Sequence, residues 1–229
     1  DWYINKLRNK VNDSPPLKLT LTEEQYRGKN RNQIFFFNPR NEDMNVPMNI
    51  FEGLRSIGDP RNTIQGQTIV SSKSFYLPVD YQKYSKLGLQ PNIDTSEVID
   101  RIIIQPGKGS NSFTKDDLAI MDVIASNFYD RPIYFAITCQ SSKLLGLDNY
   151  VEMEGLGLRI SPTKVRIKSQ LPSIYGFGDV DENKVYDNVM TKWKWGNFDS
   201  LKLYVDKSYM AEVQAMKLVM LRAAIEFDR

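Results

Sequence analysis

A strand, a helix and a second strand follow one another between residues 98 and 139, and this succession constrains the fold more than any other part of the chain. Residues 98–105 carry the apolar run Ile102-Ile103-Ile104 and predict a strand. Apolar residues at spacings of three and four indicate a helix over residues 114–128, and residues 133–139 predict a buried strand. The whole takes about 40 residues, the size of a βαβ crossover. Such a unit is right-handed and places its strands parallel in one sheet.

Further helices and strands are expected around this unit. Thr22-Glu23-Glu24-Gln25 is a capping-box pattern, and Thr114 with Asp117 marks another helix start. Strands are expected over residues 34–37, 68–79 and 151–160, and helices over residues 1–10, 49–57, 81–87, 184–193 and 207–227. We therefore expect an α/β fold, with a mixed sheet, at least one right-handed βαβ unit and flanking helices. We expect it to be severed at both ends, because the chain starts without Met and stops within a helical pattern.

Composition shifts suggest three regions. We expect a polar N-terminal portion over residues 1–66 that packs on the main domain, an α/β core over residues 67–205, and the start of a C-terminal helical region over residues 206–229. The last helix carries an apolar stripe, made of Val213, Met216, Met220, Ala223 and Phe227. Packing into the core is the expected role of this stripe, and docking against helices that follow is the alternative.

Several classes of site and partner are excluded or disfavoured by composition. The chain has no His, which excludes Ser-His-Asp and Cys-His catalysis and His-ligated metal centres within it. The single Cys excludes an internal disulfide, and we expect Cys139 to be an inert buried thiol. Thirty basic residues against 28 acidic ones argue against a nucleic-acid partner. The sequence contains no apolar run long enough to span a membrane.

Two loops at the expected strand ends are candidate binding sites. Lys108 and Ser110 follow the first strand, and Ser141, Ser142 and Lys143 follow the second. Ligands of open α/β sheets bind beyond the carboxyl ends of the strands, and these side chains suit an anion or a sugar hydroxyl. The alternative is two ordinary solvated turns. The phosphate-binding spacing of a nucleotide P-loop is absent.

Aromatic residues near the C-terminal third form another candidate. Tyr186, Trp193 and Trp195 could stack on sugar rings, whereas the alternative is that the tryptophans face a core or an interdomain contact.

Three acidic groups are also present, namely Asp94, Glu97 and Asp100, then Asp116, Asp117 and Asp122, and finally Asp179, Asp181 and Glu182. Their spacing favours helix N-terminal charges and solvated loops over catalysis or Ca²⁺ binding. We expect no catalytic residue, no metal and no cofactor in this chain.

Several strings resemble a known family and run through most of the chain, although the similarity is patchy between about residues 20 and 96. They are Asp1-Trp2-Tyr3-Ile4, Asp117-Leu118, Asp122-Val123-Ile124-Ala125-Ser126-Asn127, Arg131-Pro132-Ile133-Tyr134-Phe135-Ala136, Gly146-Leu147-Asp148-Asn149-Tyr150, Glu154-Gly155-Leu156, Tyr186-Asp187-Asn188-Val189-Met190 and Lys192-Trp193-Lys194-Trp195-Gly196. Together they resemble the soluble C-terminal region of bacterial multi-spanning membrane proteins that are similar to protein O-mannosyltransferases, the transmembrane-protein-260-like family.

The resemblance implies a place and a role for the chain. In such proteins an N-terminal bundle of membrane helices carries the glycosyl transfer from a lipid-linked donor, so no catalytic residue is carried over to this sequence. The implied location is the periplasmic face of the inner membrane. The implied partners are the membrane-spanning portion of the same polypeptide and an acceptor protein or glycan. The expected function is a non-catalytic accessory domain, and the alternatives are a stand-alone carbohydrate-binding module or a carboxylate-dependent hydrolase.

Overall fold

The computed structural model describes residues 15–27, 31–40, 42–89, 95–163, 178–194 and 206–228. The chain divides into two compact units, which we call unit 1 and unit 2. Unit 1 comprises Asp1–Ile133 and Ser141–Leu147, and unit 2 comprises Tyr134–Gln140 and Asp148–Arg229. The chain therefore passes from unit 1 to unit 2, back to unit 1 and again to unit 2. The boundaries expected after residues 66 and 205 stay predictions.

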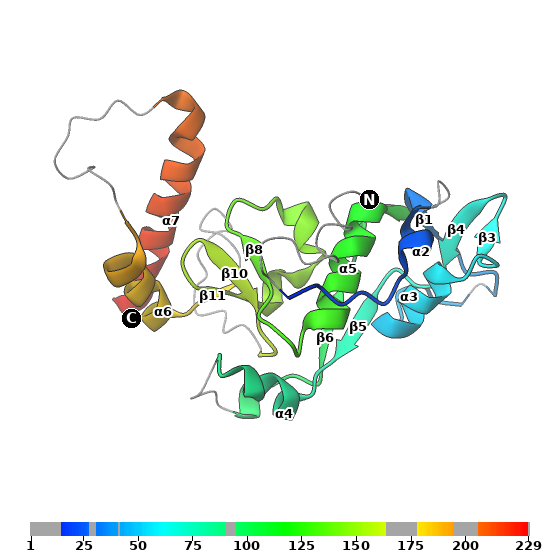
Figure 1. Cartoon of the computed structure of the whole chain (residues 1–229), viewed down its shortest axis with the longest axis horizontal. Helices are drawn as coiled ribbons and strands as arrows, with labels where there is room; N and C mark the ends of the chain where they lie inside the picture. Colours follow the sequence, from blue (N-terminus) through cyan, green and yellow to red (C-terminus); the bar gives the residue numbers. More distant parts are fainter. Residues whose placement is uncertain are drawn as a thin grey trace. The chain divides into compact units, whose positions relative to one another are not determined.

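Unit 1 contains two small mixed sheets (Figure 1). The first has the order β3-β4-β1-β7, and its strands are β1 (Gln33–Phe36), β3 (Thr63–Ile64), β4 (Gln67–Val70) and β7 (Ser112–Thr114). The second has the order β2-β5-β6, and its strands are β2 (Met48–Asn49), β5 (Phe75–Pro78) and β6 (Arg101–Ile104). The pairs β1–β4 and β2–β5 are parallel, and the other pairs are antiparallel.

The helices of unit 1 connect and cover these strands. They are α2 (Glu23–Arg27), α3 (Ile50–Gly58), α4 (Tyr81–Tyr84) and α5 (Lys115–Asn127), with 3₁₀ turns at Ser85–Leu87, Thr95–Glu97 and Ser141–Leu144. Helix α3 lies between β1 and β4 in the sequence and packs against β4 and β5. Its buried residues are Ile50, Gly53, Leu54, Ile57 and Gly58. The parallel pair β1–β4 is thus joined by a connection that contains a packed helix.

Local hydrogen bonds start the helices where the sequence predicts. In α2 the Thr22 hydroxyl accepts from the Gln25 amide N–H at 3.3 Å, and the Gln25 side chain accepts from the Thr22 N–H at 2.8 Å. Thr114 and Asp117 form the same reciprocal arrangement at the start of α5. These hydrogen bonds confirm both predicted helix starts. The starts could be predicted because the partners in a capping box lie three residues apart in the sequence.

Polar residues of α5 hold the extended segment that precedes α2. The Asn127 side chain accepts from the Lys18 N–H at 3.0 Å and donates to the Lys18 carbonyl at 2.8 Å. The fully buried Asp122 carboxylate accepts from the N–H groups of Thr20 and Leu21 at 2.7 and 3.0 Å. These bonds satisfy backbone groups that have no strand neighbour here, so Asp122 is a structural residue of unit 1.

Unit 2 is built on one four-stranded sheet of order β11-β9-β10-β8, shown with its helices in Figure 1. The strands are β8 (Tyr134–Ala136), β9 (Val151–Met153), β10 (Gly157–Ile160) and β11 (Asp179–Val180). The pair β9–β11 is parallel, and the other pairs are antiparallel. The helices are α6 (Glu182–Asp187), continued by a π-helical turn at Asn188–Lys192, and α7 (Met210–Phe227), preceded by a 3₁₀ turn at Lys207–Tyr209. Helix α7 packs against α6 and β11.

The mixed α/β class is confirmed, but the crossover expected between residues 98 and 139 is wrong. Strand β6 pairs antiparallel with β5, whereas β8 belongs to another sheet and pairs with β10. The apolar residues of β6 lie opposite those of β5, with Ile102 facing Leu77 and Ile104 facing Phe75. The expected buried strand is also wrong at β8, because its residue Tyr134 is 45% exposed. A local apolar pattern predicts a strand but does not select its partner.

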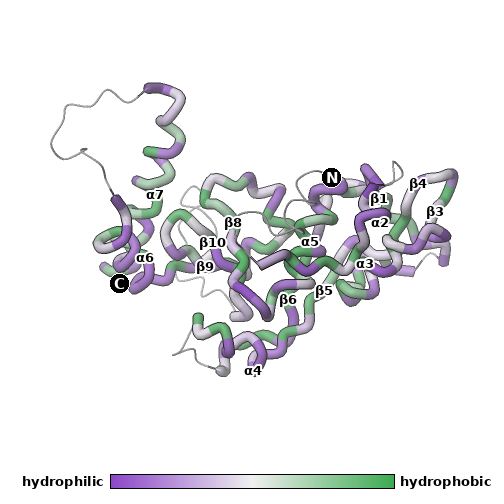
Figure 2. The backbone as a smooth tube through the Cα atoms, viewed as in Figure 1, coloured by the Kyte–Doolittle hydropathy of each residue, from purple (hydrophilic) through white to green (hydrophobic). Residues whose placement is uncertain are grey.

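Two other expectations are corrected. Residues 151–160 form the hairpin β9–β10, because Gly155 at φ 107° makes the turn that a single strand would lack. The apolar stripe expected on α7 is only partly buried among the described residues. Ala223 is buried, but Met220 and Phe227 are 37% and 52% exposed. Hydrophobic and hydrophilic residues alternate along α7 in Figure 2. The helix expected over residues 1–10 lies outside the described residues.

Candidate functional site

A row of polar residues crosses the whole sheet of unit 2. Strand register places Asp179 beside Glu152, Glu152 beside Arg159, and Arg159 beside Tyr134. Side chains alternate along a strand, so the residues between them belong to the opposite face. Those residues are the buried Val151, Met153, Leu158 and Ile160. The sheet therefore has one apolar face and one face that carries charge.

Arg159 is the centre of the charged face. Its side chain is fully buried, and its Nε donates to Glu154 Oε1 at 2.5 Å. One terminal nitrogen donates to Glu152 Oε2. The Tyr134 hydroxyl donates to the other oxygen of Glu154 at 2.7 Å. A buried guanidinium without carboxylate partners would cost several kcal/mol of folding free energy, and these two glutamates offset that cost.

Lys184 brings a second cation to Glu154 and also lies close to Asp181. Its Nζ donates to Glu154 Oε1 at 2.6 Å and lies 3.3 Å from Asp181 Oδ2. Asp181 is the N-cap of α6, since its Oδ1 accepts from the Lys184 N–H at 3.0 Å. The cap thus fixes Lys184 on the first turn of α6, where its ammonium group reaches Glu154.

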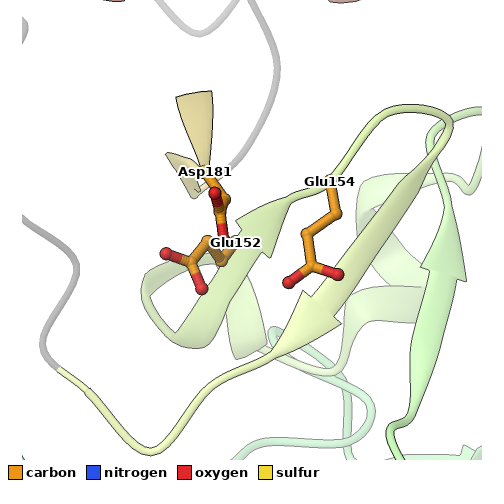
Figure 3. A group of neighbouring side chains, drawn as sticks. All are labelled: Glu152, Glu154 and Asp181. Atoms are coloured by element: carbon orange, nitrogen blue, oxygen red, sulfur yellow. The ribbon is translucent and has the colours of Figure 1, made fainter. Parts of the chain in front are cut away.

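We call Glu152, Glu154 and Asp181 the carboxylate cluster (Figure 3). One oxygen from each lies within 4.8 Å of the others, a spacing that could hold a metal ion. Hard cations such as Ca²⁺ take carboxylate oxygens, but they bind best where no other cation neutralises the ligands. Here Arg159 and Lys184 already donate to the cluster. A metal would have to displace Lys184, so the geometry is that of a salt-bridge network.

Two members of the cluster have oppositely shifted pKa values. Burial is the largest influence on both carboxyl groups. For Glu152, burial outweighs the attraction of Arg159 and raises the pKa above its ordinary value. For Glu154, the hydrogen bond from Lys184, the positive charge of Arg159 and the hydrogen bonds from Tyr134 and Arg159 together outweigh burial and lower the pKa. Neighbouring titratable groups with opposite shifts are one mark of a functional site, although structural ion pairs produce them too.

Sequence reasoning missed this cluster. It grouped Asp181 with Asp179 and Glu182, because they are neighbours in the chain. The usable signal is the alternation Glu152-Met153-Glu154, which places two carboxylates on one face of a strand whose other face is apolar. Asp181 joins them only through the parallel pairing of β11 with β9, which the sequence does not indicate.

The two predicted loops do lie next to each other in unit 1. The Gln105 N–H donates to the Leu145 carbonyl at 2.7 Å, which brings the segments after β6 and around residue 145 together. Lys143, however, donates to Asp116 and Asp117 at 2.5 and 2.8 Å, at the N-terminus of α5. Lys108, Ser110, Ser141 and Ser142 are exposed. Binding by these five residues stays a prediction, and Lys143 already has carboxylate partners.

The aromatic candidates occupy different surroundings in unit 2. Tyr186 is 56% exposed, and its ring meets the ring of Phe227 edge-on at 5.9 Å between centroids. Trp193 is half-buried with its ring beside Gly155. Trp195 lies outside the described residues. A sugar-stacking role for these rings stays a prediction.

Comparisons with known proteins identify one family. The model of TMEM260-associated domain 2 matches residues 1–184. No curated protein and no solved structure matches the chain. Within the described residues, every helix is too short or too polar to cross a membrane.

Proposed function

The chain belongs to the TMEM260-associated domain 2 family, and from this premise we propose that it is a non-catalytic domain of a membrane-bound, glycosyltransferase-like protein. In this proposal the domain positions an acceptor protein or glycan. Its partner is the membrane-spanning portion of the same polypeptide, and its location is the periplasmic face of the inner membrane. The family match supports the association with TMEM260-like proteins, and the finer role is our inference.

The proposal that the domain is non-catalytic rests on the hydrogen bonds that already occupy the carboxylate cluster. A general acid or nucleophile needs a carboxyl group that can exchange protons or reach a substrate. Glu154 is held by Arg159, Lys184 and Tyr134 at the same time. A hydrolase that used this group would first have to break three hydrogen bonds. The cluster is therefore better suited to holding the sheet of unit 2 together than to acid–base chemistry.

A transfer assay tests the proposal. The measurement is transfer of sugar from a lipid-linked donor to an acceptor protein, with the purified chain and with membranes that contain the parent protein. We expect no transfer by the chain alone. We also expect excess chain to compete for the acceptor and raise the apparent KM of the parent for it. Heat-unfolded chain is the control and should not compete. Transfer by the chain alone, or an unchanged KM, would overturn the proposal.

A further inference from the structure

A hollow of about 300 Å³ opens in unit 1 at the carboxyl ends of β1 and β4. Its wall comes from the residues after β1, from Ser71 after β4, and from Ser56 and Asn62 in and after α3. Ligands of α/β folds bind beyond the carboxyl ends of parallel strands, where the loops diverge. The hollow has this position relative to the parallel pair, and the candidate residues of the sequence analysis do not line it.

The backbone of the hollow is held in place by its own hydrogen bonds. The Phe37 N–H donates to the Val70 carbonyl at 2.9 Å, which prolongs the pairing of β1 with β4. The Asn62 amide group donates to both the carbonyl and the hydroxyl of Ser56 at 2.9 Å. The wall formed by α3 and the wall formed by β4 are thus joined, since the Ile69 N–H donates to the Asn62 carbonyl at 3.1 Å.

Polar groups in the hollow have unused hydrogen-bonding capacity. Within the part of the chain that the structure describes, the Arg40 guanidinium has no ion pair, and Asn62 Oδ1 and the Ser71 hydroxyl accept no hydrogen bond. The Glu42 carboxylate has one long contact, at 3.5 Å from the Asn38 amide. Donors and acceptors of both charges therefore line one small space.

This combination favours a neutral ligand with several hydroxyl groups. Arg40 and Glu42 have opposite charges, so the lining has no net charge that would favour an anion or a cation. A hydroxyl group can accept from Arg40 and donate to Glu42 or Asn62 Oδ1. The ring of Phe37, which is 44% exposed, offers an apolar surface for the C–H groups of such a ligand. Ligand sites span roughly 300 to 1,000 Å³, so this one fits a single ring.

We propose that this hollow binds one sugar residue. The inference rests on the proposed function for its biological ligand, the end of a glycan on the acceptor. The contacts that carry it are those of Phe37, Arg40, Glu42 and Asn62. It assigns a glycan contact to unit 1, whereas the aromatic candidates Tyr186 and Trp193 belong to unit 2.

Titration of the ¹⁵N-labelled chain tests the assignment. The probes are the methyl glycosides of glucose, galactose and mannose, and the readout is the amide spectrum. At least one glycoside is expected to shift the backbone amides of Phe37, Asn38, Arg40, Glu42 and Asn62 and of residues 69–71. We expect Arg40→Ala and Phe37→Ala to weaken that binding by about tenfold, because each removes one direct contact. Arg55→Ala is the matched control, since the exposed Arg55 bonds the Phe51 carbonyl and lies outside the hollow.

The outcomes separate this inference from the proposed function. No shift with any glycoside, or equal binding by Arg40→Ala and wild type, would overturn the sugar site. Glycine or inorganic phosphate shifting the same amides in place of the sugars would also overturn it. If the chain still competes for the acceptor protein in those cases, the proposed function stands and only the sugar site fails. Amide spectra of both variants that match the wild type elsewhere will show that they fold.

Discussion

At the scale of single residues, Glu152 and Glu154 illustrate how one buried guanidinium can stabilise two carboxylates differently. Arg159 donates a hydrogen bond to each of the two glutamates. Glu154 has two further donors, Lys184 and Tyr134, and its pKa is lowered. For Glu152, burial dominates and its pKa is raised. The free energy of unfolding should therefore depend on pH in opposite ways through these two neighbours.

The direction in which each glutamate changes the free energy of unfolding with pH follows from proton linkage. Because the folded pKa of Glu154 is lowered, its contribution to stability is present above its ordinary value of 4.5 and is lost as pH falls below that value. Because the folded pKa of Glu152 is raised, its contribution is present below 4.5 and is lost as pH rises through the folded value. Relative to wild type, Glu154→Gln should thus become less stable as pH rises from acid to neutral, and Glu152→Gln should become more stable.

Urea unfolding of both variants and of the wild type over a pH series measures this difference. Each glutamine variant is the control for the other, since both remove one charge from the same network. Relative stabilities that change in the same direction with pH in the two variants would contradict the prediction.

At the scale of elements, the N-terminus of α5 connects three parts of unit 1, which are the end of β7, helix α5 itself and residues 141–147. Thr114 and Asp117 form the capping box, and Lys143 from the segment 141–147 donates to Asp117, whose side chain is 9% exposed. A negative charge at a helix N-terminus is favourable, and Lys143 adds an ion pair to it. Helix α5 is thereby tied to a segment that returns to unit 1 from unit 2.

Two substitutions test this junction. We expect Thr114→Ala to cost about 1 kcal/mol of stability, as for other capping residues. Lys143→Ala should cost up to about 1 kcal/mol, because Lys143 and its second partner Asp116 are partly exposed. The effects should not add, since both side chains contact Asp117. Lys108→Ala is the control and should stay within about 0.5 kcal/mol, because Lys108 is exposed. Denaturant unfolding of these three variants and of the double variant Thr114→Ala/Lys143→Ala measures the losses, and additive losses in the double variant would contradict a shared partner.

The same elements show what the sequence can predict. Capping boxes at Thr22 and Thr114 were predictable because their partners lie three residues away. The partners of β6 and β8 were not, because an apolar run is compatible with any apolar neighbour, and long-range packing decides the pairing. The hairpin at Gly155 was partly predictable. The Gly155-Leu156-Gly157 sequence signals a turn, but hydrophobic periodicity alone predicted one continuous strand over residues 151–160.

The candidate site, too, could be predicted only in part from the sequence. The alternation of Glu152 and Glu154 is visible in the sequence, but the pairing of Glu154 with Lys184 depends on where the first turn of α6 lies. The hollow at Arg40 depends on the parallel pairing of β1 and β4. No local pattern predicts either arrangement, because the residues involved come from separate elements.

At the scale of the whole molecule, the two units share the chain in alternation. Leu144, Leu145 and Leu147 belong to unit 1 and are almost fully buried, although residues 134–140, just before them, belong to unit 2. Burying a leucine side chain contributes about 1.5 to 3 kcal/mol. A chain cut after residue 133 would lose all three from the core of unit 1.

Truncation therefore gives a clear expectation. A chain of residues 1–133 should unfold at lower urea concentration than unit 1 does within the whole chain, or show no cooperative transition. A chain of residues 1–147 should regain a cooperative transition, because it restores the three leucines and Lys143. Circular dichroism over a urea series compares them. Equal midpoints for the two truncated chains would mean that the returning segment contributes nothing to unit 1.

The returning segment also has a consequence for synthesis on the ribosome. The polypeptide emerges from its N-terminus, so residues 15–133 leave the exit tunnel before residues 141–147. Until that segment follows, the nascent unit 1 lacks the leucines that complete its core and exposes apolar surface. Strand β8 also leaves the tunnel before its partner β10, so at first it has no strand with which to pair. The interval between these events is a period in which a chaperone has a defined surface to bind.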